Sequence, residues 1–134
     1  MAYRAAALGA ALPVLLAVRV ALLLMPWRRL ARWMPVADGA APDWQLRHAI
    51  RAVGQAARIV PGATCLPQAV AGRILCAAIG QATLIRIGVR RDGAGKVMAH
   101  AWLVDGRGRI LLGGTPAEID RFTPLADLKA EAGA

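Results

Sequence analysis

The sequence contains few aromatic residues, few acidic residues and only two cysteines, and each shortage limits the kinds of core, partner or site that the protein can have. Aromatic side chains make up 4% of the 134 residues, so alanine, leucine, valine and isoleucine must build the core. The two cysteines form no C-x-x-C pair, and the two histidines form no H-x-x-x-H pair. We therefore expect no metal ion and no cofactor. If Cys65 and Cys76 share a helix, they lie about 16 Å apart, too far for a disulfide.

Eight Asp and Glu stand against 17 Lys and Arg, which gives a net charge of +9 at pH 7. This balance favours an acidic partner, such as nucleic acid, anionic lipid or an acidic peptide. The arginines, however, are spread along apolar stretches and are not interleaved with aromatic side chains, as they are on nucleic-acid-binding surfaces. We therefore expect no nucleic-acid partner.

Apolar residues make up 57% of the chain, enough for the core of one domain, and they are densest in residues 5–25. A transmembrane helix of about 20 residues would have to carry Arg19, at about 3 kcal/mol. A signal peptide would need a small-residue cleavage pattern, which residues 22–27 lack. We prefer a third interpretation: a helix, kinked near Pro13, that packs on the domain or lies at a membrane surface. An interfacial border follows it, formed by Trp27, Arg28, Arg29 and Trp33.

These features predict the cellular location of the protein and the boundaries of its segments. We expect a cytoplasmic protein that attaches peripherally to the inner face of the membrane. Residues 1–34 form an apolar, arginine-bordered helical element, and residues 35–42 form a turn-rich connector. Residues 43–134 form the main domain.

The main domain is predicted to be α+β, with two helices followed by antiparallel strands. Asp43 should cap a helix that runs from Trp44 to Ala57 and stops before Pro61-Gly62. Thr64 should cap a second helix that begins at Cys65. Strands are expected at residues 84–89, 97–104 and 109–112, with turns at 92–95 and 105–108.

Cys65 is the candidate nucleophile, because the free N–H groups and the dipole at a helix N-terminus favour a thiolate. His100, on a strand between small residues, is the candidate base; His48 lies mid-helix among arginines. A helix-borne thiol that faces a strand-borne imidazole is a workable pair. The residues alone leave a plainer alternative open, in which both side chains are structural. Cys76 is expected to be inert in either case.

Four segments between residues 63 and 125 resemble those of a known enzyme family. In order and spacing they are similar to the transglutaminase-like cysteine proteases of lasso-peptide biosynthesis, which act as leader peptidases. The segments are Ala63-Thr64-Cys65-Leu66-Pro67-Gln68-Ala69, Ile85-Arg86-Ile87-Gly88-Val89-Arg90-Arg91, Ala99-His100-Ala101-Trp102-Leu103 and Phe122-Thr123-Pro124-Leu125.

The resemblance implies a transglutaminase- or papain-like core, in which Cys65 attacks the scissile carbonyl and His100 relays the proton. It also implies a precursor peptide as substrate, with a small leader-binding protein and an ATP-dependent macrolactam cyclase as partners. Two other functions stay open. One is an acyl transferase that uses the same pair of residues, and the other is a non-catalytic, membrane-associated scaffold.

The sequence departs from the family pattern at the residue that orients the imidazole. The family has an aspartate on the strand after the histidine strand. A four-residue turn at 105–108 would place Gly113 opposite His100, so that position holds a glycine. Asp105 has the wrong parity to share a face with His100. The expected substitute is Asp120, from a segment that also holds Glu118; without it, Cys65 and His100 act as a dyad.

Overall fold

The computed structural model describes residues 2–26, 29–30, 32, 34–35 and 37–128. The helices are α1 (Ala2–Leu24), α3 (Asp43–Ala57), α4 (Cys65–Ala78) and the short α5 (Pro116–Ile119). The strands are β1 (Thr83–Arg91), β2 (Val97–Asp105), β3 (Ile110–Leu112) and β4 (Thr123–Leu128). The predicted α+β class is confirmed, with helices first and a small antiparallel sheet after them.

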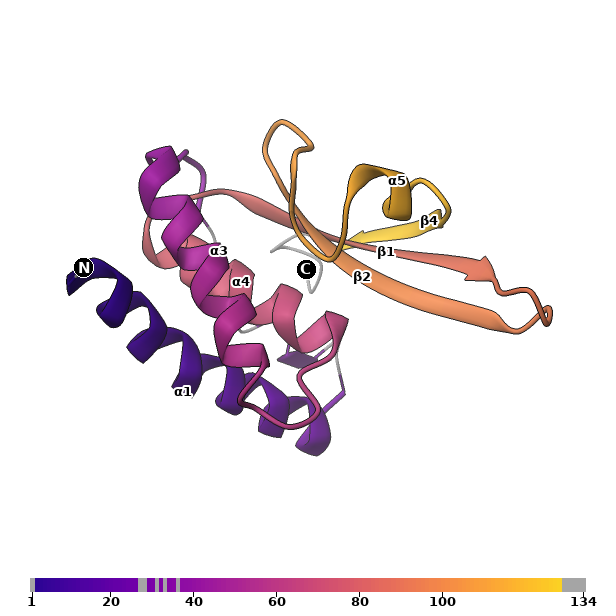
Figure 1. Cartoon of the computed structure of the whole chain (residues 1–134), viewed down its shortest axis with the longest axis horizontal. Coiled ribbons are helices and arrows are strands. Elements are labelled where there is room, and N and C mark those ends of the chain that lie inside the picture. Colours follow the sequence, from indigo (N-terminus) through magenta and orange to yellow (C-terminus); the bar gives the residue numbers. More distant parts are fainter. Residues whose placement is uncertain (1, 27–28, 31, 33, 36, 129–134) are drawn as a thin grey trace.

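Helices α1, α3 and α4 form two layers on one side of the sheet. Helix α4 contacts β1, β2 and β3, while α3 and α1 pack against α4 and against each other (Figure 1). One apolar core runs through these layers, and its largest fully buried side chains include residues from five different elements. They are Leu15 of α1, Val53 of α3, Val70 of α4, and Ile85 and Leu103 of the sheet. Helix α4 therefore packs directly on the sheet, and α1 and α3 form the layer behind α4.

Helix α1 is a single element that continues through Pro13. Its inner face is part of the core, with Ala11, Leu15 and Val18 at most 3% exposed. Residues Ala6–Leu24 are also long and apolar enough to cross a membrane. Of the expected interfacial border, Trp27, Arg28 and Trp33 lie outside the described residues.

The sheet has the strand order β3-β2-β1-β4, with β1 antiparallel to both of its neighbours. Strand β4 and helix α5 were not predicted from the pattern of residues. The chain leaves β3 at one edge, passes through α5 over the face opposite α4, and returns as β4 at the other edge (Figure 1). The sheet is therefore not the simple meander that the sequence suggested.

Two local expectations are corrected. Asp43 does not cap α3: Pro42 occupies the cap position, and Asp43 is the first helical residue, 3.5 Å from Arg109 Nη2. The turn between β2 and β3 has a different register from the predicted one. Leu103 pairs with Leu112 and Val104 with Ile110, because Leu111 forms a bulge, an extra residue that the hydrophobic pattern alone does not reveal.

Asp105 ends β2 and closes this turn from within. Its side chain is 5% exposed and accepts hydrogen bonds from the N–H groups of Arg107 and Arg109, each at 2.9 Å, and from the Arg109 guanidinium at 2.9 Å. Burial alone would raise the pKa of this carboxyl, but the hydrogen bonds and the guanidinium charge together lower it. The turn is thus stabilised by an ionised carboxylate.

Replacing Asp105 by asparagine should therefore destabilise the protein in a pH-dependent way. A lowered pKa contributes stability above the unfolded-state value of about 3.9, and this contribution disappears as the pH falls through the folded-state pKa. We expect Asp105→Asn to lose about 1 kcal/mol at pH 7, because a charged acceptor becomes a neutral one. Urea unfolding at pH 7 and at pH 3 measures the loss. An equal loss at both pH values would contradict this account.

Candidate active site

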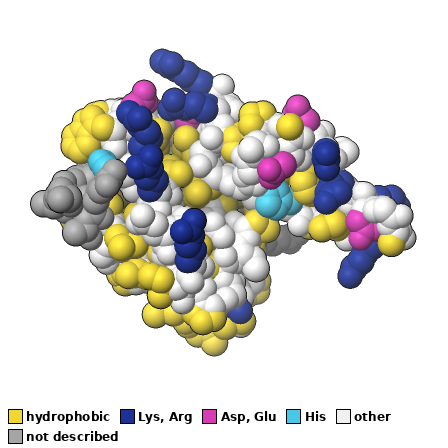
Figure 2. Space-filling view, in the orientation of Figure 1, with side chains coloured by type: hydrophobic (Ala, Val, Ile, Leu, Met, Phe, Trp, Pro, Cys, Tyr) yellow, Lys and Arg dark blue, Asp and Glu magenta, His cyan; other side chains and the backbone are white. Residues whose placement is uncertain are grey.

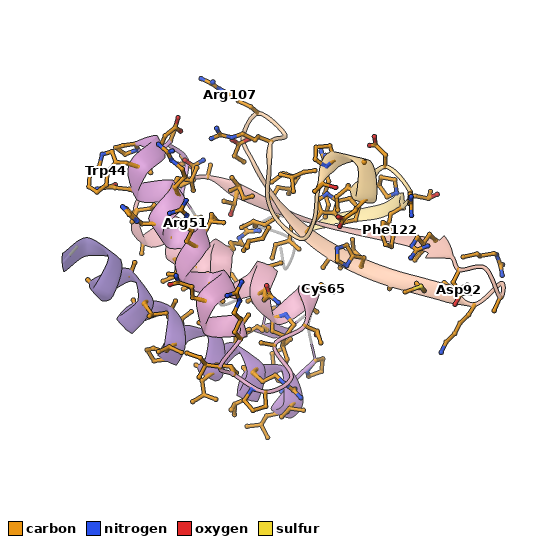
Figure 3. The ribbon with its side chains drawn as sticks, in the orientation of Figure 1. Trp44, Arg51, Cys65, Asp92, Arg107 and Phe122 are labelled. Carbon is orange, nitrogen blue, oxygen red and sulfur yellow. The ribbon has the colours of Figure 1, made fainter. Side chains whose placement is uncertain are left out.

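Cys65 is the first residue of α4, where the helix begins beside the middle of β2 (Figure 3). The turn before it needs Gly62, whose φ of +75° is unfavourable for other residues. Thr64 is the N-cap, as predicted, but its side chain makes no capping hydrogen bond. Instead, Gln68 Nε2 donates to the Ala63 carbonyl at 2.8 Å and ties the helix to the turn.

His100 lies on β2 and is partly buried. Its ring stacks on Phe122, with centroids 5.1 Å apart, and on Trp102 at 6.2 Å. Gly88, opposite His100 on β1, leaves room for these aromatic rings, because a Cβ there would lie 2.8 Å from Trp102 and 3.0 Å from Phe122. The imidazole is therefore held in one orientation by packing.

A main-chain hydrogen bond fixes the tautomer of His100. The ring atom Nε2 lies 2.5 Å from the carbonyl oxygen of Gly113. A carbonyl oxygen accepts and never donates, so Nε2 must carry the proton. In the neutral ring, Nδ1 then holds the free lone pair. Nδ1 is therefore the atom that is able to take a proton from a thiol.

Cys65 and His100 line the same cavity, of about 220 Å³. The other lining residues are Gln68, Ala69, Ala101, Leu112 and Gly113. A larger cavity of about 470 Å³ lies between α3 and β3, but its lining residues include neither a cysteine nor a histidine. The structure thus brings the predicted nucleophile and base together at the smaller cavity.

Sequence reasoning used the free N–H groups at this helix start only to favour a thiolate and did not consider them as donors to an oxyanion. The first backbone hydrogen bond into α4 runs from Gln68 N–H to Thr64 O. The N–H groups of Cys65 and Leu66 precede it and have no acceptor within the described part of the chain, as at any helix start. Donors in this position are suited to a developing oxyanion. The signal for this role was the Pro61-Gly62 stop with the cysteine behind it, because a nucleophile at a helix start has these donors beside it.

This arrangement agrees with the comparison to known families. Residues 9–127 match the Transglutaminase-like superfamily. The chain belongs to that superfamily. Its members include cysteine peptidases and acyl transferases, and they are often cysteine-dependent enzymes. No curated protein and no solved structure matches the chain.

In this transglutaminase-like chain, the carboxylate expected to orient the imidazole is not beside it. Ile119 is buried against the aromatic cluster, and Asp120, which follows it, is exposed and lines a cavity with Trp102, not with His100. No hydrogen bond or ion pair joins Asp120 to His100 among the residues described. Glu118 lines a second cavity together with His100. The atom bonded to the ring is the Gly113 carbonyl oxygen.

The second cysteine of this transglutaminase-like chain has none of these features. Cys76 is 0% exposed in the core of α4. Burial raises the pKa of its thiol to about 12, so almost no thiolate forms at neutral pH. The two cysteines therefore form an internal comparison, with one at an open cavity beside an imidazole and the other in the core.

Iodoacetamide should distinguish the two thiols in the folded protein. We expect carboxamidomethylation of Cys65 and none of Cys76 at pH 7.5, because the thiolate is the reacting species and Cys76 is both buried and protonated. His100→Ala should slow the labelling of Cys65 by removing the base. Peptide mass spectrometry over time measures both sites, with urea-unfolded protein as the control in which both react. Equal rates with and without the imidazole would mean that the two side chains do not meet.

Proposed function

We propose that the chain is a cysteine peptidase that removes the leader from a ribosomally synthesised lasso-peptide precursor. The observation that carries the proposal is the shared cavity, in which Cys65 lies at a helix start and Gly113 holds His100 with Nδ1 free. The four segments that resemble lasso-peptide leader peptidases support the choice of substrate. The transglutaminase-like fold supports the choice of chemistry.

The proposed reaction has two steps. His100 Nδ1 accepts the thiol proton while Cys65 Sγ attacks the scissile carbonyl, and the N–H groups of Cys65 and Leu66 stabilise the oxyanion. Collapse of this intermediate breaks the C–N bond, and the imidazolium gives its proton to the departing amine. Water, deprotonated by His100, then hydrolyses the thioester and regenerates the thiol. The products are a leader with a free carboxylate and a core peptide with a free amine.

The free amine defines the proposed partners. A small leader-binding protein presents the precursor, and an ATP-dependent macrolactam cyclase closes the ring on the amine that cleavage releases. The proposal therefore places the genes for a precursor peptide and a cyclase beside the gene for this chain. If neighbouring reading frames encode neither, the choice of substrate loses its support.

The direct test is cleavage of that precursor by two cysteine variants. Cys65→Ala should abolish cleavage and stay folded, because its side chain lies at an open cavity. Cys76→Ala should retain cleavage, because it removes only a core thiol. Mass spectrometry of the precursor, incubated with each variant and the leader-binding protein, gives the result. Wild-type activity in Cys65→Ala would overturn Cys65 as the nucleophile, whereas no cleavage by the wild type would favour the non-catalytic scaffold.

The same assay separates a peptidase from an acyl transferase. Both reactions pass through a Cys65 thioester, which water resolves in one case and an amine in the other. Cleavage in the presence of a large excess of glycinamide distinguishes them, because glycinamide competes with water for the thioester. A leader that ends in a free carboxylate supports the peptidase, and a leader amide supports the acyl transferase.

We propose further that α1 rests on an anionic membrane surface at the cytoplasmic face. Its outer side carries an apolar stripe of Leu16, Val20, Leu23 and Leu24, which are 45–79% exposed. Figure 2 shows hydrophobic side chains gathered along the lower edge of the molecule, where α1 ends. The exposed Arg29 and Arg32 follow the stripe, and residues 1–37 contain no Asp or Glu. Apolar surface bordered by arginine is complementary to anionic lipid.

The core contacts of α1 favour this peripheral arrangement over a membrane span. Leu15 is 0% exposed and Val18 3% exposed inside the protein. A spanning α1 would have to withdraw these side chains from α3 and α4 and carry Arg19 into the bilayer. Burying only the outer stripe needs neither change.

Vesicle flotation should detect the proposed attachment. Vesicles that contain phosphatidylglycerol should carry the protein upward, and pure phosphatidylcholine vesicles should not. The double variant Leu23→Glu/Leu24→Glu should remain at the bottom, because it places charge on the apolar stripe. The matched control, Val97→Glu/Met98→Glu, changes two exposed apolar residues on β2 and should still float. High salt or carbonate should release the wild type; retention through both washes would indicate a spanning helix.

A further inference from the structure

The outer edge of β2 is uncovered beside the candidate active site. The hairpin of β1 and β2 projects past the helices (Figure 1). Strand β3 pairs with β2 only at Leu103 and Val104, and residues 97–99 of β2 are exposed. The edge is therefore open from the end of β3 to the tip of the hairpin.

The hydrogen bonds at both ends of β2 show which backbone groups face this open edge. At the hairpin tip, Asp92 N–H donates to Lys96 O at 2.9 Å, so these opposite residues are a hydrogen-bonded pair. Such pairs alternate with non-hydrogen-bonded pairs along an antiparallel ladder. Ala99 belongs to the second kind, so its N–H and C=O face away from β1. The same parity holds at the far end, where Asp105 N–H donates outward to Arg109 O.

Val97 and Ala99 thus present outward N–H and C=O groups. Neither residue has a backbone partner on this side among the residues that the structure describes. Two residues of an extended strand span about 6.8 Å, which is the spacing at which another extended peptide places its own groups. An open edge of this kind is a template for an added strand.

We propose that the substrate segment next to the scissile bond binds as an extended strand along this edge and pairs with Val97 and Ala99. The inference rests on the proposed peptidase function. His100 and Ala101 follow on the same strand and line the cavity of Cys65. A peptide registered on Val97 and Ala99 therefore continues directly to the thiol.

A cavity beside the edge provides a place for a substrate side chain. It has a volume of about 270 Å³, lies next to His100, and is lined by Arg90, Met98, Gly113, Glu118, Arg121 and Phe122. Side chains of an added strand alternate between the two faces of the sheet. Main-chain pairing would therefore position the peptide, while one side chain that enters this cavity would contribute selectivity.

The charge of the hairpin argues against a second copy of this chain as the occupant. Arg90, Arg91 and Lys96 lie near the tip, and Figure 2 shows basic side chains at this end of the molecule. Two copies paired edge to edge would bring these like charges together, which is how natural edge strands resist self-association. A peptide substrate need not carry the same positive charge, so this repulsion does not oppose its binding at the edge.

The test removes the outward N–H of Ala99 and leaves the β1 ladder intact. Proline at this position has no N–H, and its ring projects toward the incoming strand. In the Cys65→Ala background, Ala99→Pro should weaken binding of the fluorescein-labelled precursor about 10-fold, measured by anisotropy. In the active protein it should raise KM similarly and leave iodoacetamide labelling of Cys65 unchanged. Ala99→Ser keeps the N–H and is the matched control.

The outcomes separate this inference from the proposed function. Wild-type binding and KM in a folded Ala99→Pro protein, with Cys65→Ala inactive, would overturn the added strand and leave the peptidase standing. Cleavage by Cys65→Ala would overturn Cys65 as the nucleophile, and no cleavage by the wild type would overturn the peptidase itself. If Ala99→Pro does not fold, precursors N-methylated singly at each residue within four positions of the scissile bond take its place. An alternating loss of binding along the peptide supports the added strand, and a uniform response overturns it.

Discussion

The close contact of α4 with β2 and β3 fixes where the nucleophile lies. At Gly72 a Cβ would sit 2.6 Å from a Leu112 methyl group and 3.0 Å from a Leu103 methyl group, so a larger residue would require these leucine side chains to move. Because α4 begins at Cys65, the depth of this contact sets the position of the thiol relative to β2, which carries His100. The buried faces of α3 and α1 reinforce the arrangement from behind. The core therefore positions the site, and the site itself is small and open.

The imidazole is held by a neutral group where the resemblance leads one to expect a charged one. A carboxylate would orient the ring and also stabilise the imidazolium that forms when the thiol loses its proton. The Gly113 carbonyl provides the first effect and only part of the second. Gly113 has a φ of +110°, and a Cβ there would lie 2.5 Å from Trp102 Cβ, so this backbone path excludes any side chain, including aspartate. The glycine is thus the structural counterpart of the missing acid, and its carbonyl makes the bond.

The parts of the fold that the sequence predicted are those governed by local rules. The helix from Cys65 follows from a turn, a cap residue and an apolar period, and the β1–β2 hairpin follows from alternation and a glycine turn. What the sequence did not reveal depends on contacts between distant segments. The bulge at Leu111 changes the register of β3, and α5 and β4 are placed by packing on Trp102 and the far side of β1. Pairing Cys65 with His100 needed only a helix start and a strand. Which of Asp105, Glu118 and Asp120 could orient the imidazole depends on the path of the chain after β3, which local sequence patterns do not reveal.

One departure from regular strand geometry accounts for two features of the site. After Leu112 the chain turns away from β2 through Gly113 and Gly114, both in conformations that favour glycine. Had β3 continued, its next residues would have paired with β2 beyond Leu103 and covered the edge that leads to the hairpin tip. Because it stops, the Gly113 carbonyl becomes available to the His100 ring instead of to a ladder, and Val97 and Ala99 keep their outward groups. Holding the base and exposing a strand edge beside it are therefore consequences of the same turn, which explains why the cavity, the imidazole and the open edge meet at one point.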